Sequence, residues 1–173
     1  GASNTAVGVS CLQLNTTASY CTAVGRQALY ANTTGADNTA VGYAALDANT
    51  TATRNTAIGK DALTANTTAN DNTAVGHNSL SATTTGNNNV AVGKSALLAN
   101  TTGTSNVAVG YNALDSNTTG TRNVAIGNAA LDAGATDYDN TAVGDLAMSA
   151  NNGGDYNTGI GGRALIGNTT AIE

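Results

Sequence analysis

A glycine recurs every seventeen residues along the chain, from Gly8 to Gly161, and each closes a copy of the pentapeptide NTAVG or a near variant. The 173 residues therefore form ten tandem repeats that align without insertion or deletion. A strict period in this range is typical of one structural unit stacked on copies of itself. We predict a single repeat domain over residues 1–173. The glycines expected at a sharp turn in each repeat are Gly8, Gly25, Gly42, Gly59, Gly76, Gly93, Gly110, Gly127, Gly144 and Gly161.

The aligned repeats give the consensus NTAVGxxALxANTTGxx, whose seventeen columns we number from the first Asn. Column four is always Val or Ile, and column nine is always Leu or Met. Columns six, seven, ten, sixteen and seventeen vary freely; column six, for example, holds Arg26, Tyr43 and Lys60 in successive repeats. We expect the variable columns to face solvent and the fixed columns to be structural.

Seventeen residues are too few for a pair of packed helices, and the fixed segments are short, β-branched and closed by Gly or Asn. These features predict an all-β chain, a parallel β-solenoid (β-roll) of ten 17-residue coils. Each coil is expected to contain a strand around TAV, a bend at Gly, a second short strand around AL and a third extended segment around NTT. The Asn of columns one and twelve suit ladders in which side-chain amides bond from coil to coil.

Columns four and nine supply the main large apolar side chains, so we assign them to the structural core, either inside the coil or against another chain. Adjacent strand residues point to opposite faces. One member of each fixed apolar pair, columns three and four or eight and nine, should therefore face outward and form an apolar stripe, which predicts lateral or trimeric packing. If alternation fails beside the glycine bends, both members point inward. The assigned core residues are Val7, Val24, Val41, Ile58, Val75, Val92, Val109, Ile126, Val143, Ile160, Leu29, Leu46, Leu63, Leu80, Leu97, Leu114 and Leu131.

The two cysteines, Cys11 and Cys21, lie ten residues apart, and each replaces a fixed residue of the consensus. We favour a disulfide that joins the first coil to the second, which suits an oxidising, extracellular environment. The alternative is a pair of unpaired small residues in a frayed terminal coil.

Seven copies of column twelve read Asn-x-Thr and are formal glycosylation acceptors stacked above one another. The same composition also suits a ladder or a turn. The candidate acceptors are Asn15, Asn32, Asn49, Asn66, Asn100, Asn117 and Asn168.

Composition and charge argue against several functions. Six basic and eleven acidic residues give a net charge of -5 and are dispersed, so no basic patch suits nucleic acid, and no apolar run is long enough to insert in a membrane. The lone His77 occupies variable column six and is expected on a solvated face. We predict no enzyme, no catalytic residue, no cofactor and no metal site, although Asp137, Asp139 and Asp155 loosely resemble a calcium loop.

The segment NTAVGxxAL, as in residues 38–46, resembles the head repeats of trimeric autotransporter adhesins of the YadA-like type, and related repeats of bacterial and phage surface fibres. The resemblance covers all ten repeats, although an Ala-Asn-Thr-Thr segment makes the unit longer than the usual head repeat. It implies a left-handed parallel β-roll, three chains packed side by side, and a rod that presents a binding surface to host matrix or other cells.

The chain begins and ends inside the repeat pattern with no visible cap, and an open terminal coil exposes unpaired backbone groups. We expect either flanking domains beyond this sequence or another copy of the chain to cover each end, and the second option makes a filament. We predict a non-enzymatic, self-associating subunit of an extracellular filament or surface fibre, either a head-to-tail polymer or a trimer, located outside the cell or on its surface. One alternative is the head of a trimeric adhesin that binds host matrix or other cells. A second is an ice-binding solenoid, suggested by the nearly regular Thr-Thr columns.

Overall fold

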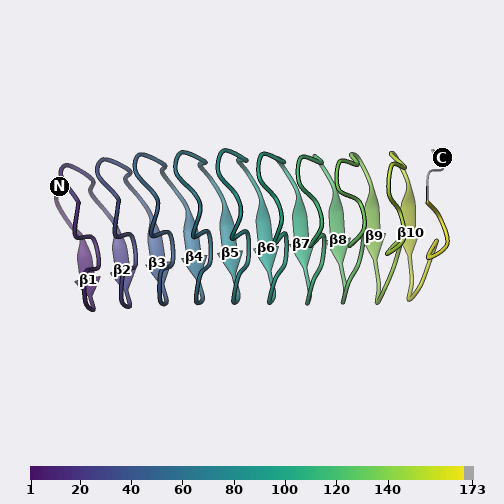
Figure 1. Ribbon diagram of the computed structural model, residues 1–173, viewed down its shortest axis with the longest axis horizontal. Helices are drawn as coiled ribbons and strands as arrows, with labels where there is room; N and C mark the ends of the chain where they lie inside the picture. The colour runs from purple at the N-terminus through teal and green to yellow at the C-terminus, as the bar shows by residue number, and fades with distance from the viewer. Residues whose placement is uncertain (170–173) are drawn as a thin grey trace.

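The computed structural model describes residues 1–169 and shows one short strand per repeat, stacked into a single parallel sheet with β1 and β10 at opposite ends (Figure 1). Each strand pairs with the strand seventeen residues away, as in Thr39 with Thr56. This confirms the all-β parallel solenoid, while the hand of the coil stays a prediction. The strands are β1 Thr5–Val7, β2 Thr22–Val24, β3 Thr39–Val41, β4 Thr56–Ile58, β5 Thr73–Val75, β6 Val90–Val92, β7 Val107–Val109, β8 Val124–Ile126, β9 Thr141–Val143 and β10 Thr158–Ile160.

Each strand is only three residues long because a glycine in column five ends it. Gly25, for example, has a φ of 126°, a conformation that disfavours any residue with a side chain. A Cβ atom there would lie 2.5 Å from the carbonyl oxygen of Gly42 in the next coil. The predicted turn role is confirmed for all ten glycines, whose φ angles are all positive.

The predicted second strand, around the Ala-Leu segment, is wrong. Residues of columns six to eleven form a turn, in which columns seven and nine adopt left-handed backbone angles, such as φ 51° at both Ala44 and Leu46. Extended strand geometry requires negative φ. Coil-to-coil bonding nevertheless continues through this turn, since the N–H of Leu29 donates to the Ala45 carbonyl at 3.0 Å.

The interior is narrow and contains the small and aliphatic residues of columns three, eight and nine. Leu29 to Leu131 in column nine, with Met148, are fully buried, as are the alanines of columns three and eight in these coils, such as Ala40 and Ala45. The leucine part of the predicted core is therefore confirmed. The residues of columns eight and nine both point inward, because they lie in a turn, where side chains do not alternate between two faces as they do in a strand.

The column-four residues are not interior, which corrects their assignment to the core of the coil. In a strand the neighbours of an inward residue face outward. Since Ala91 is fully buried, Val90 and Val92 on either side of it lie on the outer face of the sheet. The fixed Ala of column three leaves room for only a methyl group beneath the strand, and the branched residues line the surface.

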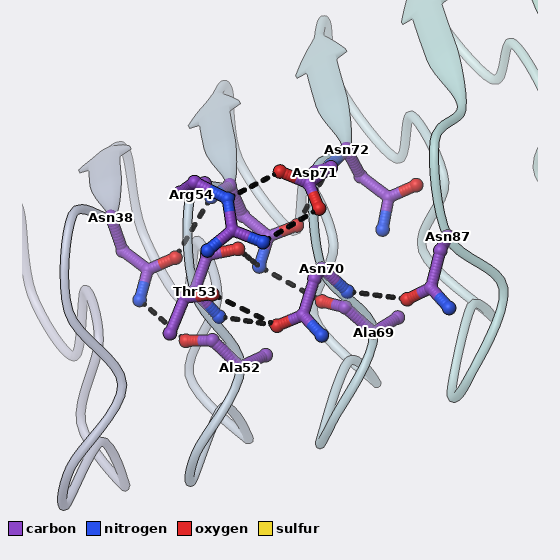
Figure 2. Close-up of polar contacts among 10 residues, drawn as sticks. Asn38, Ala52, Thr53, Arg54, Ala69, Asn70, Asp71, Asn72 and Asn87 are labelled. Atoms are coloured by element: carbon purple, nitrogen blue, oxygen red, sulfur yellow. Dashed lines mark hydrogen bonds and ion pairs between the residues drawn. The ribbon is translucent and has the colours of Figure 1, made fainter.

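Two columns of buried asparagine connect the coils, as predicted. In column one, the side-chain oxygen of Asn38 accepts from the backbone N–H of Asn55 at 2.9 Å, and its side-chain nitrogen donates to Ala52 O (Figure 2). In column twelve, the Asn49 amide nitrogen donates to the Asn32 side-chain oxygen at 2.7 Å. The column-one bonds pair backbone groups that lie outside the three-residue strands.

Candidate interaction surface

The outer face of the ten-stranded sheet carries an apolar stripe along the rod, formed by Val or Ile in column four. Val92 is 36% exposed and Ile126 is 40% exposed. Structure thus places the column-four residues together in one line. The lateral packing of another chain against this stripe stays a prediction.

The stripe doubles in width over three adjacent strands. In β6, β7 and β8, column two is Val instead of the Thr found in the other repeats, and column two faces outward on the same side as column four. Sequence analysis did not single out this substitution, although it is visible in the alignment of the repeats. We call this surface the outer β6–β8 patch, and its residues are Val90, Val92, Val107, Val109, Val124 and Ile126.

A row of cations and tyrosines borders the stripe on the column-six side. The guanidinium of Arg26 and the ammonium of Lys60 each lie 5.7 Å from the ring centre of Tyr43, one from each neighbouring coil. Lys94 lies 5.5 Å from the ring of Tyr111 in the same way. Such contacts between a cation and an aromatic ring are modestly stabilising at an exposed site.

Ion pairs border the stripe on the other side, in column seventeen. The guanidinium of Arg54 makes two bonds to the Asp71 carboxylate, at 2.6 and 2.9 Å (Figure 2), and Arg122 makes a matching pair with Asp139. The hydrogen bonds from Arg54 hold the pKa of the Asp71 carboxyl below its usual value. Charged groups therefore flank the apolar stripe on both sides, in columns six and seventeen.

A different face of each coil carries the Thr-Thr columns. The column-thirteen hydroxyls are used inside the stack, since Thr33 Oγ1 donates to the Thr50 carbonyl at 3.0 Å. The column-fourteen threonines project into solvent at every coil from the first to the eighth. These exposed residues are Thr17, Thr34, Thr51, Thr68, Thr85, Thr102, Thr119 and Thr136.

The predicted disulfide between Cys11 and Cys21 is wrong, because both cysteines are free. Cys21 precedes β2 and its thiol donates to Gly35 O, whereas the Cys11 thiol donates to Gly8 O, beyond the other end of β1. Cys21 thus lies at the start of a strand and Cys11 near the end of one, and a three-residue strand is about 10 Å long. A disulfide tolerates a Cα separation of only about 7 Å. Burial also raises the pKa of the Cys21 thiol.

Most of the candidate glycosylation sites are inaccessible in the folded chain, which corrects that prediction. Five of the seven asparagines are fully buried, and the side-chain nitrogen that would carry the glycan donates to a backbone carbonyl, as Asn32 Nδ2 does to Gly35 O. Asn15 and Asn168 are half-buried, and the sequon of Asn168 extends beyond the described residues. The buried acceptors are Asn32, Asn49, Asn66, Asn100 and Asn117.

The acidic residues that resembled a calcium loop point to different partners. Asp139 pairs with Arg122, the Asp155 carboxylate accepts from the backbone N–H of Tyr138, and Asp137 is buried in the coil. Within residues 1–169, no group of three or more His, Cys, Asp or Glu is arranged to hold a metal ion, and no helix is long and apolar enough to cross a membrane. His77 lies on the exposed column-six row, as expected.

No protein family, no curated protein and no solved structure matches this chain. The geometry of its surfaces therefore has to support any functional proposal.

Proposed function

We propose that this chain is a structural, non-enzymatic protein whose rods associate side by side to build an extracellular filament or surface fibre. The apolar stripe on the outer face of the sheet is the observation that supports this proposal best. Its branched side chains stand in a straight row at a constant spacing, and the row widens at the outer β6–β8 patch. Long apolar patches on a protein surface are typical of contacts with another macromolecule.

A second copy of the same chain is the partner that fits this stripe. Stacked strands lie about 4.8 Å apart, so rows of Val and Ile on two copies share one repeat and can interdigitate along the whole rod. A single-strand-wide face is too narrow to form a core alone. Burying it between rods contributes about 25 cal/mol per Å² of apolar surface removed from water, and this contribution adds up over successive coils.

The resemblance of the repeats to heads of trimeric adhesins and to surface fibres supports the same arrangement and an extracellular location. It also carries the alternative function, a rod that presents host-binding groups. In that case the varied residues of column six, such as Tyr43 and Lys60, are the contact residues.

Sedimentation velocity of the purified chain, with Val109→Lys as the test variant, examines the proposal directly. Val109 lies at the centre of the outer β6–β8 patch and faces outward, so a lysine there can reach solvent without disturbing the coil. We expect the wild-type chain to sediment as an oligomer or fibre, and the variant to dissociate while its circular dichroism spectrum is unchanged.

The matched control is Thr102→Lys, which places the same charge on the exposed Thr row and should leave association intact. A wild-type chain that remains monomeric at high concentration, or association that Val109→Lys leaves unaffected, would contradict lateral packing through this face.

The regular row of eight exposed threonines favours ice binding as a further candidate function. That function needs a solvent-facing hydroxyl array and no partner chain. Thermal hysteresis of the wild-type chain that is lost in Thr102→Lys, with association unchanged, would favour ice binding over the fibre.

A further inference from the structure

In the eighth coil, the column-twelve ladder has no side chain of its own. In the eighth coil, column twelve is Gly134, and column fifteen is Asp137, where every other repeat has Gly or Ala. A Cβ atom added to Gly134 would lie 2.8 Å from Asp137 Oδ2. The Asp137 carboxyl therefore occupies the space that a column-twelve side chain fills in the other coils.

The carboxyl also takes over one bond of the missing asparagine. Asp137 Oδ2 accepts from Asn151 Nδ2 of the next coil at 2.9 Å, just as Asn32 Oδ1 accepts from Asn49 Nδ2 elsewhere in the ladder. The other carboxyl oxygen, Oδ1, accepts from the N–H of Gly153 at 2.7 Å.

The other bond of the missing asparagine is not replaced by any amide. In the preceding rung, Asn117 Nδ2 donates to Asn100 Oδ1 at 2.9 Å. The Asn117 Oδ1 atom should in turn accept from column twelve of the eighth coil, but that residue is Gly134. Among residues 1–169, Asn117 Oδ1 is buried and has no hydrogen-bond partner. A buried polar atom without a partner loses its hydration and gains nothing in return.

The surroundings of Asp137 disfavour its charged form. Asp137 is only 2% exposed, and its neighbours in columns twelve and fifteen of the adjacent coils, Asn117, Asn151, Gly120 and Gly154, carry no charge. Burial raises the pKa of the Asp137 carboxyl, and the negative charge of Asp155 acts in the same direction against the opposing effect of the Gly153 and Gly154 N–H groups. Among residues 1–169, Asp155 is the charged group whose field acts on this carboxyl, and its charge is negative.

We propose that Asp137 is a proton-binding site, at which the folded chain holds the neutral acid and its O–H group donates to Asn117 Oδ1. The proton comes from solvent as the eighth coil closes, and it replaces the amide hydrogen that the consensus asparagine supplies. A carboxylic acid can donate one bond and accept two. Its oxygens already accept from Asn151 Nδ2 and the Gly153 N–H, so the acid hydrogen is the donor available for Asn117 Oδ1.

This site makes the stability of the eighth coil depend on pH in a defined direction. The folded-state pKa is raised, so the folded chain binds the proton more tightly than the unfolded chain. Stability is then complete below the unfolded pKa, about 3.9 for Asp, and falls as the pH rises toward the folded pKa. Within that window the folding equilibrium constant decreases by about tenfold per pH unit.

Infrared spectroscopy tests the protonation directly, by detecting the carbonyl stretch of a protonated carboxylic acid. At pH 5 an ordinary aspartate is about nine-tenths ionised. Burial raises the pKa of Asp132 as well, so the difference between variants is measured. We expect an acid band in the wild-type chain at pH 5 that is weaker in Asp137→Asn and undiminished in Asp145→Asn, which alters an exposed carboxylate. A wild-type spectrum without the band, or a band of equal intensity in Asp137→Asn, would overturn the proposal.

Denaturant unfolding between pH 4 and pH 8 provides an independent measurement. The wild-type midpoint should fall relative to that of Asp137→Asn as the pH rises. If Asp137→Asn does not fold, the double variant Gly134→Asn with Asp137→Gly rebuilds the consensus rung and serves as the reference. A wild-type midpoint that keeps a constant difference from the reference over this range would show that Asp137 is ionised in the folded chain.

Discussion

Replacing Asn72 with alanine should remove one rung of the column-one ladder from the middle of the rod. The side-chain oxygen of Asn72 accepts from the backbone N–H of Asn89 at 2.9 Å, and its nitrogen donates to the Gly86 carbonyl at 3.0 Å. Alanine leaves both backbone groups buried and without these partners. Each unsatisfied buried group costs about 1–3 kcal/mol, so we expect the free energy of unfolding to fall by about 4 kcal/mol.

The matched control is Asn70→Ala, two residues earlier along the chain (Figure 2). Asn70 is half-buried, and its side-chain oxygen accepts from the N–H of Thr53 at 2.7 Å. Water can reach the Thr53 N–H once the amide is removed, so this variant should lose no more than about 1 kcal/mol.

Urea denaturation followed by circular dichroism measures both variants, and amide hydrogen exchange at Asn89 reports the local effect. Exchange at Asn89 should accelerate strongly in Asn72→Ala and remain slow in Asn70→Ala. If the two variants lose the same stability within about 0.5 kcal/mol, the column-one amides are not essential connections between coils, and the reasoning is wrong.

Three further perturbations follow from the backbone angles, the first two coils and the ion pairs. Ala129→Gly should raise the free energy of unfolding, since Ala129 has a φ of 46° and a left-handed angle costs about 1–2 kcal/mol. The control Ala65→Gly, at a position without positive φ, should lower the free energy of unfolding by about 0.5–1 kcal/mol, and both are measured by urea denaturation. Cys21→Asn should raise the free energy of unfolding by about 1 kcal/mol, because an amide oxygen is a stronger acceptor than sulfur for the next coil's N–H. An unchanged free energy of unfolding would show that the Cys21 thiol is already an adequate acceptor. Arg54→Ala should lower the free energy of unfolding at pH 7 but not at pH 2. The ion pair lowers the pKa of Asp71, so it contributes stability only where Asp71 is ionised, above that pKa. A loss of stability that is the same at both pH values would exclude the ion pair as the source of the loss.

The main features of the architecture follow from the seventeen-residue period. A repeat held without insertion permits only a stack of equal coils, and the fixed Asn columns predicted the side-chain ladders that the structure contains. The turn role of column five also followed from sequence, because only glycine tolerates that backbone angle beside another coil.

The number of strands per coil did not follow from sequence. The Ala-Leu segment has the composition of a strand, but Leu46 adopts a φ of 51° because the turn directs both Ala45 and Leu46 into the same narrow interior. Local preference disfavours this angle, and the packing and coil-to-coil hydrogen bonds of the whole stack outweigh that preference.

The apolar stripe on the outer face was also determined partly by sequence and partly by tertiary structure. By itself, the sequence determined that one member of each fixed apolar pair within a strand faces outward, since this depends only on the two-residue alternation of strands. Only the tertiary structure decided which member it is. Ala40 faces inward because Leu46 and the amides already fill the interior, so the larger Val41 lies on the surface. Tertiary structure likewise separated Cys11 from Cys21, buried most of the sequons, and brought Asp137 into the space that Gly134 leaves, because these depend on distances between residues that are remote along the chain.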